Sequence, residues 1–381
     1  MSDSLQGKLD QLHQTLENGP TPDKFSVLVG FDGFVDEIIE VVDKRTDFQS
    51  YERLGTIAEF GERISRAAGL STNIEFVPKA VKLGGNGPIM ANALVGCGAK
   101  TSYIGALGYP ELNPVFKDFA EQCHQVISLA DPGHTDALEF GDGKVMLGKL
   151  MSLNDVNWKN LHKLLGDEGI ADMFAHVDMV ATVNWTMTPY MNEIWDGIQH
   201  VVPKAEGLDK PLFFVDLADP EKRKNEDIRQ AMKIIQSFRP YYRVVLGLNR
   251  KEATEVAEVL GLQLSDAASA VSLEEITKAL AEALDIWCLM VHPTHAAAAV
   301  KDGEYAYTVG PYTSKPRLTT GAGDNFNAGF CMGLLLGLTL EQSLMLGTAN
   351  SGFYVRQMRS ATFPELKGFV QLWSEKGTNE F

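Results

Sequence analysis

The stretch Leu318-Thr-Thr-Gly-Ala-Gly-Asp-Asn-Phe-Asn-Ala-Gly-Phe330 sets a glycine turn directly before an apolar helical run. A turn that opens a helix leaves backbone N–H groups unpaired, and the helix dipole adds partial positive charge at the same point. We therefore predict that Gly321, Ala322 and Gly323 form an anion hole for a phosphoryl group. Asp324 follows at once and can accept a proton from an attacking hydroxyl, as a catalytic base. An ordinary turn with Asp324 as a helix N-cap explains the same residues, so the rest of the chain has to decide.

The composition is that of a soluble globular protein with a large core, since 45% of the 381 residues are hydrophobic and 22% are charged. The 34 basic and 50 acidic residues give a net charge of −16, which disfavours binding to nucleic acid or to anionic membranes. The four cysteines are far apart in the sequence, which is typical of reduced thiols. Residues 1–24 contain no apolar signal-peptide core. These features predict a cytoplasmic enzyme or binding protein.

Five apolar runs of strand length alternate with segments of helical periodicity. The runs are Ser26–Gly30, Met179–Val183, Leu212–Val215, Val244–Leu248 and Trp287–Val291. This alternation predicts an α/β fold with a mostly parallel sheet buried on both faces by helices. Polar residues stand at the ends of the runs: Asp32, Asn184, Asp216, Asn249 and His292. Because open parallel sheets bind ligands beyond the carboxyl ends of their strands, these residues predict where the site lies.

Three further segments predict a small, half-exposed antiparallel sheet, which we interpret as a lid. They lie near residues 36–45, 73–84 and 136–150, and the last has the pattern of a hairpin around Gly141-Asp142-Gly143. Residues 73–83 alternate between apolar and polar, which leaves one apolar face and favours a homodimer formed through the lid. Around this lid we expect a helical appendage at residues 1–24, the α/β domain at 25–365 and a C-terminal tail at 366–381.

A second glycine-rich turn, Leu83-Gly-Gly-Asn-Gly-Pro-Ile-Met-Ala-Asn92, follows the predicted lid strand. Its three glycines keep side chains away from the backbone, so that a ligand can approach closely. Pro88 is suited to the first turn of the helix that begins there. A tight crossing from lid to body, with no ligand, explains this turn equally well.

Together, Gly84-Gly85-Asn86-Gly87 and Thr319-Thr320-Gly321-Ala322-Gly323-Asp324 resemble the two motifs of the ribokinase-like PfkB carbohydrate kinase family. The resemblance extends from about Val27 to Ala361 and includes the small-residue helix Gly347–Gly352. It implies a doubly wound α/β body with a small β lid, as the strand pattern also predicts. It further implies transfer of the γ-phosphate of ATP to a sugar, sugar-acid or nucleoside hydroxyl, with Mg²⁺ as cofactor.

The resemblance also implies roles for individual residues. Asp324 is expected to be the catalytic base beside the anion hole of Gly321, Ala322 and Gly323. Asp36 is expected to bind sugar hydroxyls, with Asp32 sharing or taking that task, and Gly85 and Asn86 are expected to contact the sugar as well. Asn350 is expected to lie near the nucleotide. Asn249-Arg-Lys-Glu252 matches the family's Asn-x-x-Glu element, in which Glu252 binds Mg²⁺ through water. The same two residues also form a helix capping box, and the two interpretations are compatible.

Several positions depart from the family pattern. Ile89 stands where many members have a sugar-binding asparagine, Val291–Ala296 replaces a Thr-Leu-Gly segment along the nucleotide phosphates, and Gly108–Glu111 lacks the usual acidic turn. Leu318 replaces an aspartate that helps relatives hold K⁺, so we expect activity without K⁺ dependence. His292 and His295 have a spacing seen in metal sites, but no third ligand accompanies them, and hydrogen-bonding roles are favoured.

The function expected from all of this is that of an ATP-dependent sugar kinase with Mg²⁺ as cofactor and a small-molecule sugar as partner. One alternative is a nucleoside kinase of the same fold, because Asp36 and the glycine turn would hold a ribose equally well. Another is a catalytically weak sugar- or nucleotide-binding regulator, which the altered Ile89, Leu318 and His292 positions favour.

Overall fold

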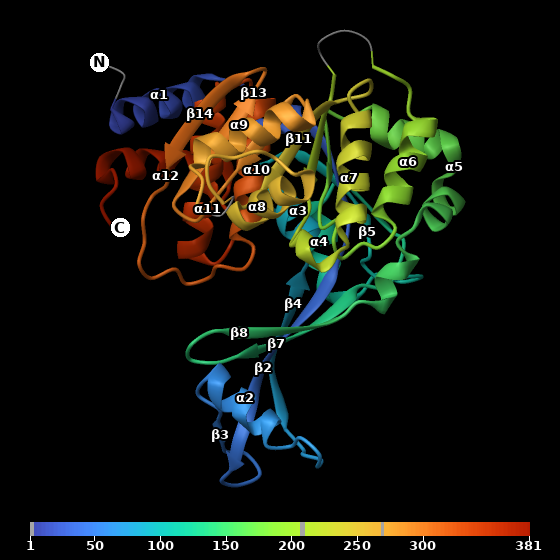
Figure 1. Cartoon of the computed structure of the whole chain (residues 1–381), viewed down its shortest axis with the longest axis vertical. Helices are drawn as coiled ribbons and strands as arrows, with labels where there is room; N and C mark the ends of the chain where they lie inside the picture. Colours follow the sequence, from blue (N-terminus) through green and yellow to red (C-terminus); the bar gives the residue numbers. More distant parts are fainter. Residues whose placement is uncertain (1–3, 206–209, 268–269) are drawn as a thin grey trace.

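The protein consists of a broad α/β body from which a narrow lid projects at one end (Figure 1). The computed structural model describes residues 4–205, 210–267 and 270–381. Two sheets organise these residues, a nine-stranded sheet in the body and a five-stranded sheet in the lid. Residues 1–3, which belong to the expected N-terminal appendage, lie outside the described ranges.

The body sheet has the strand order β14-β13-β12-β11-β10-β9-β1-β5-β6. Its strands are β1 (Ser26–Phe31), β5 (Lys100–Gly105), β6 (Gln125–Ser128), β9 (Met179–Thr182), β10 (Leu212–Asp216), β11 (Arg243–Leu248), β12 (Cys288–Val291), β13 (Ala296–Lys301) and β14 (Glu304–Val309). The strands from β12 to β6 pair in parallel, and β13 and β14 add an antiparallel edge. The five predicted apolar runs are β1 and its neighbours β9 to β12, which confirms the fold class.

Helices cover both faces of this sheet, so that residues of β1 contribute to two different cores. Val27 and Val29 pack on one side and Leu28 and Phe31 on the other. The first side holds α1 (Leu5–Asn18), α3 (Asn86–Gly96), α4 (Lys117–Gln122), α10 (Ala322–Leu335), α11 (Leu340–Gln357) and α12 (Phe363–Lys376). The second holds α5 (Trp158–Ala175), α6 (Met191–Val201), α7 (Asn225–Ser237), α8 (Arg250–Leu260) and α9 (Leu273–Leu284). Short 3₁₀ turns lie at Pro22–Lys24, Pro114–Phe116, Met151–Asp155 and Pro220–Lys222.

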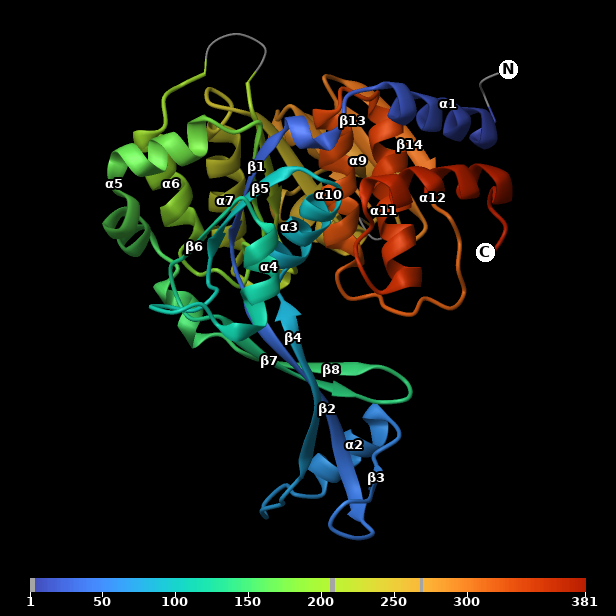
Figure 2. The same cartoon turned by 180° about the vertical axis from the view of Figure 1, so that it is seen from behind.

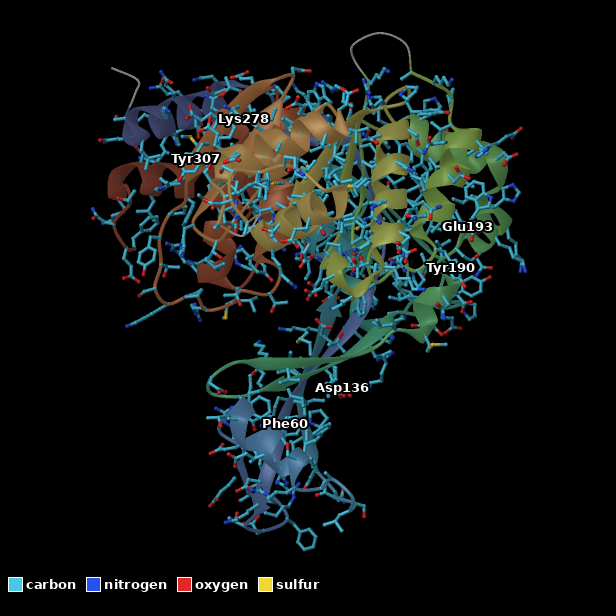
Figure 3. The ribbon with its side chains drawn as sticks, in the orientation of Figure 1. Phe60, Asp136, Tyr190, Glu193, Lys278 and Tyr307 are labelled. Atoms are coloured by element: carbon cyan, nitrogen blue, oxygen red, sulfur yellow. The ribbon has the colours of Figure 1, made fainter. Side chains whose placement is uncertain are left out.

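The lid is a curled sheet whose centre is a single long strand. Its elements are β2 (Phe34–Arg45), β3 (Tyr51–Arg53), β4 (Phe76–Gly84), β7 (Gly133–Glu139) and β8 (Lys144–Lys149), with helix α2 (Ile57–Ser65). Strand β2 pairs with β3, β4 and β7, and β7 continues into β8 as a hairpin. Figure 3 shows Phe60 on α2 and Asp136 on β7, both below the body. Phe60 packs with Ile39 and Leu138 in a small core that belongs to the lid itself.

The two ends of the chain pack together on one side of the body, where α1 and α12 lie side by side (Figures 1 and 2). Residues 366–381 were expected to form a tail, but most of them belong to α12. This helix begins with a capping box between Thr362 and Glu365 and buries Leu366, Val370 and Trp373 at helical spacing. The expectation of a tail overlooked this periodicity.

Candidate active site

The polar residues predicted at the strand ends meet along one edge of the body sheet. Asp32 follows β1, Asn184 follows β9, Asp216 ends β10, Asn249 follows β11 and His292 follows β12. These strands are direct neighbours in the sheet. The glycine turns at the starts of α3 and α10 bring Asn86 and Asp324 to the same edge, because Asn86 bonds Asp324 and its backbone bonds Asp32.

The turn at the start of α10 has the geometry expected of an anion hole. Gly321 is the N-cap with a left-handed backbone (φ 89°), and a Cβ there would lie 2.7 Å from the Tyr354 hydroxyl. Glycine is therefore required on both conformational and steric grounds. The Ala322 N–H donates to the Thr319 carbonyl at 3.1 Å, whereas the Gly323 N–H has no hydrogen-bond partner among the described residues. The dipole of α10 adds partial positive charge at this point. Ala322 and Gly323 line a cavity of about 660 Å³ at this point.

Asp324 lies in the first turn of α10 and is only 6% exposed. Its Oδ1 accepts a hydrogen bond of 2.9 Å from the Asn86 side-chain amide. Burial raises the pKa of Asp324 to about 8, with further increases from the charges of Asp32 and Glu252 and a decrease from Asn86. A carboxylate with a pKa near neutrality is well suited to accept a proton from a sugar hydroxyl.

Asp32 is fully buried, and all its bonds are to protein groups. Its Oδ2 accepts from the Asn86 N–H at 2.9 Å and from the Asn184 amide at 2.7 Å, and its Oδ1 accepts from the Gly87 N–H at 2.8 Å. Burial raises the pKa of Asp32 to about 6. Protein donors thus engage both oxygens of Asp32, and its expected contact with sugar hydroxyls stays a prediction.

Asp36 lies where β2 leaves the body, and its carboxylate lies against the lid-to-body turn. A Cβ at Gly84 would approach Asp36 Oδ2 to 2.3 Å, so a side chain there would displace the Asp36 carboxylate. Burial raises the pKa of Asp36, while a hydrogen bond from Thr135 of β7 lowers it. Gly85 follows with φ 101°, a conformation that favours glycine. Asp36 and Gly85 thus lie near each other where the paired strands β2 and β4 join the body.

Asn249 and Glu252 form the capping box of α8, as the structural interpretation of this motif predicted. Glu252 is buried and accepts hydrogen bonds of 2.9 Å from the backbone N–H groups of Asn249 and Asp219.

Asp216 received no role from the family resemblance, although its position at the end of a predicted strand indicated that it belongs to the site. One oxygen of Asp216 accepts from Asn327 at 3.0 Å, and the other is buried without a partner in the described residues. Burial, with the charges of Glu252 and Asp324, raises the pKa of Asp216 well above its usual range.

The cavity beside the anion turn is walled by the ends of β11 and β12 and by α10 and α11. His292 stacks on Phe326 with ring centroids 4.8 Å apart, and both line the cavity. Burial lowers the pKa of His292 to about 4, so this ring is neutral at physiological pH. Thr348 and Ser351 of α11 also line it. Asn350, expected near the nucleotide, lies between these two residues in the sequence, is fully buried and donates to the Asn325 carbonyl at 2.7 Å.

A model of the prokaryotic ketohexokinase family matches residues 9–373 of the chain. The chain belongs to the prokaryotic ketohexokinase family. A ketohexokinase of Haloferax volcanii is 28% identical over 346 residues, which cover 90% of each chain. The family also shares the PfkB carbohydrate kinase motifs, and this member is an ATP-dependent sugar kinase, a phosphotransferase that acts on a hydroxyl group.

Solved structures of other kinases share this fold. Ribokinase of Thermotoga maritima has a TM-score of 0.60 at 16% identity, covering 91% of this chain and 98% of its own. Arabidopsis thaliana ribokinase, complexed with ribose and ATP, has a TM-score of 0.61 at 16% identity, covering 92% and 99%. A nucleoside kinase of Methanocaldococcus jannaschii has a TM-score of 0.59 at 12% identity, covering 91% and 98%.

Outside the proposed active site, the structure contains a group of carboxylates near one another. Within the residues that the structure describes, the carboxylates of Asp219, Glu221 and Glu255 make up the one cluster with metal-ligand spacing, and neither His292 nor His295 belongs to it. Lys251 pairs with all three of these carboxylates. None of the described helices is long and apolar enough to cross a membrane.

Proposed function

We propose that this enzyme phosphorylates a ketohexose with ATP, as the name of its family and of its Haloferax volcanii relative implies. The observation that carries the chemistry is the buried Asp324 carboxylate at the start of α10, next to the Ala322–Gly323 wall of the large cavity. A base and an anion hole side by side are the basic requirements for phosphoryl transfer to an alcohol.

In the proposed mechanism the sugar lies between the lid and the body. Asp36 and Gly85 hold the sugar hydroxyls from the lid side, and Asn86 contacts both the sugar and Asp324. Asp324 accepts the proton of the attacking hydroxyl, and the first-turn amides of α10 stabilise the charge on the transferring phosphoryl group. Closure of the lid over the sugar excludes water, which would otherwise compete as acceptor.

We propose that ATP occupies the cavity of about 660 Å³, with its phosphates toward Gly323. The volume is in the range of small-molecule sites. Asn249 and His292 line the same cavity and can hydrogen-bond the phosphates. Because Asn350 is buried behind Thr348 and Ser351, its part in the proposal is to hold α11 against α10.

The residues at this edge fit a magnesium ion. Asp216 has a buried oxygen without a partner among the described residues, and its pKa is raised partly by the charge of Glu252. Mg²⁺ prefers oxygen ligands and keeps several waters, so Asp216 directly and Glu252 through water are suited to hold it. Bound there, Mg²⁺ would neutralise negative charge on the ATP phosphates.

A coupled assay of ADP release over a panel of acceptors tests the proposal. The panel consists of fructose and other ketohexoses, glucose, ribose, and a purine nucleoside, each with ATP. We expect the highest kcat/KM for a ketohexose and no turnover without Mg²⁺. A nucleoside as best substrate would favour the nucleoside kinase alternative, and binding without ADP release from any acceptor would favour the regulator. Since the reaction consumes ATP, we further propose that the enzyme works in the cytoplasm.

A further inference from the structure

Asp32 lies at the end of β1 and has no exposed surface, yet it carries a carboxylate with no cationic side chain bonded to it. A buried carboxylate is costly unless several donors compensate it. Here the donors are the backbone N–H groups of Asn86 and Gly87 and the side-chain amide of Asn184. The fold thus bears the desolvation cost of a buried carboxylate, and this carboxylate holds one turn in place.

The turn that Asp32 holds is the start of α3. The N-cap Gly85 offers no side chain to accept bonds from the first N–H groups of this helix. Asp32 supplies those acceptors from a different strand, as a capping side chain would. The fit is tight, because a Cβ at Gly87 would lie 2.6 Å from Asp32 Oδ1 and 2.3 Å from the Tyr103 hydroxyl. Tyr103 itself donates to the Asp32 carbonyl, which fixes the strand end.

Asn86 connects this held turn to the proposed base. Its backbone N–H donates to Asp32 at 2.9 Å, and its side-chain amide donates to Asp324 Oδ1 at 2.9 Å. On the far side of Asp32, Asn184 has a left-handed backbone (φ 58°) and donates to the same Oδ2. An unbroken chain of hydrogen bonds therefore runs from Asn184 through Asp32 and Asn86 to Asp324.

We propose that Asp32 is a positioning residue that acts through Asn86: it fixes the start of α3 so that the Asn86 amide holds the Asp324 carboxylate in the orientation needed for proton transfer. This inference rests on the proposed function of Asp324 as base. In this proposal Asp32 affects kcat and does not bind the sugar. Asn86 has a partner within the protein, Asp32, whether or not the sugar is bound.

The charges around Asp324 determine the sign of the pH effect. The charges of Asp32, which follows β1, and of Glu252 on α8 raise the pKa of Asp324, and the Asn86 amide lowers it. The charge of Asp324 in turn raises the pKa values of Asp216 on β10 and Tyr354 on α11. If Asn86 is released from its position, Asp324 loses its side-chain donor and holds its proton more strongly. The acidic limb of the kcat–pH profile should then move to higher pH.

The test is a double-mutant cycle of Asp32→Asn and Asn86→Ala, with kcat and sugar KM measured for the intact enzyme. An asparagine at position 32 puts an amide where the carboxylate accepted bonds, so it cannot satisfy all three donors. We expect each single variant to lower kcat by about 10- to 100-fold, the usual cost of a misplaced catalytic group. We expect the kcat of the double variant to lie within about threefold of the kcat of the less active single variant, because the effects of coupled residues are not additive. Asn86→Ala should move the acidic limb to higher pH, and it should also raise the sugar KM because Asn86 is a proposed sugar contact. Asp32→Asn should leave the sugar KM nearly unchanged. Its acidic limb should move less, because the substitution also removes a charge that raises the pKa of Asp324.

Asp36→Asn is the matched control, because it changes the other carboxylate at the lid base. It should raise sugar KM, and its effect should add to that of Asn86→Ala. Asn184→Ala removes one of the three donors to Asp32 but keeps the Asp32 charge. It should lower kcat less than Asp32→Asn does and move the acidic limb to higher pH, which keeps the test open if Asp32→Asn fails to fold. A rise in sugar KM at constant kcat would make Asp32 a sugar ligand, and additive losses with an unshifted pH profile would leave it a purely structural residue. If Asp324→Asn retained its turnover, the proposed role of Asp324 as base would be wrong. This result is distinguishable from a failure of the proposal for Asp32.

Discussion

At the scale of single residues, the site works against the stability of its own fold. Asp324, Asp216 and Glu252 are carboxylates buried within reach of one another's charge, and burial raises the pKa of each. Such an arrangement is unfavourable without a ligand and becomes favourable when cations enter. This is the behaviour expected of a site built to receive metal and phosphate.

The pKa of Asp324 predicts the pH dependence of the reaction. A base must be ionised in order to act, and the free enzyme holds the pKa of Asp324 at about 8. We expect kcat/KM to rise with pH and to level off above about pH 8, because kcat/KM reports groups of the free enzyme. Bound Mg²⁺ should move the limb for kcat lower. Profiles measured from pH 5 to 10 check this, and a kcat/KM that is flat between pH 6 and 9 would contradict it.

Replacing the base should separate activity from stability. Asp324→Asn should lower turnover by on the order of 10²–10⁴, the usual worth of a general base. The folded protein favours the protonated form of Asp324, so this residue's contribution to the free energy of unfolding is fully present below about pH 4 and is lost as pH rises to about 8.

Asparagine has no such loss, so the Tm of Asp324→Asn should exceed that of the wild type increasingly between pH 4 and 8, by about 2 °C or more at the upper end. The Tm of Asp36→Asn, measured over the same pH range, provides a comparison for a carboxylate of the lid, outside the anion turn. A variant that is less stable than wild type at pH 8 would show that Asp324 is favourably charged in the fold.

At the scale of elements, the sequence predicted the sheet well because buried strands leave a direct signature. The continuous apolar runs of β1 and β9 to β12 gave both the fold and the edge where the site lies. The glycine turns indicated α3 and α10 by their need for close backbone approach. Long-range pairings were not predictable, because no local pattern shows that Asp32 bonds Asn86 and Gly87, 54 and 55 residues away. The same limit applies to Asn350, whose burial depends on how α11 packs on α10.

The anion turn allows a graded test of its backbone. A Cβ at Gly323 would lie 3.4 Å from the His292 ring, which is ordinary contact. Gly323→Ala should therefore keep most of the affinity for ATP, whereas the branched side chain of Gly323→Val should crowd both the ring and the phosphate and damage KM for ATP and kcat together. Steady-state kinetics with varied ATP check this. Equal kinetics for the two variants would mean that the phosphate binds away from Gly323.

The loop before this turn predicts the response to monovalent cations. Leu318 is half-buried, and its N–H donates to the Val355 carbonyl at 3.4 Å, which anchors the loop to α11. An apolar side chain cannot ligate a hard cation, which needs oxygen donors. Turnover should therefore be the same in potassium, sodium and Tris buffers at matched ionic strength. A several-fold rise that is specific to K⁺ would show that other oxygens provide the site.

At the scale of the whole molecule, the lid extends away from the body (Figure 1). One of its faces carries a row of apolar residues beside Asp36. Ala80, Ile38, Ala137 and Met146 are paired across neighbouring strands, two residues beyond Asp36 along β2. Residues paired in this way point to the same face of a sheet. Ala80 and Met146, at the two ends of the row, are exposed, Met146 to 48%, whereas Ile38 is half-buried and Ala137 is buried. The two ends of the row are therefore open to a partner.

A second copy of the chain is the partner that we expect on this row, because an exposed apolar sheet favours association. Light scattering at micromolar concentration should give twice the mass of 41.8 kDa. Met146→Lys should shift the protein toward the monomer, because a charge in the row must be desolvated on pairing. Leu164→Lys on α5, where the leucine is 45% exposed on the body, is the matched control and should leave the mass unchanged. Since the same face carries Asp36, the monomeric variant should also have a higher KM for the sugar. A wild type that is monomeric at these concentrations would contradict the dimer, and equal effects of the two lysine variants would mean that the interface lies elsewhere.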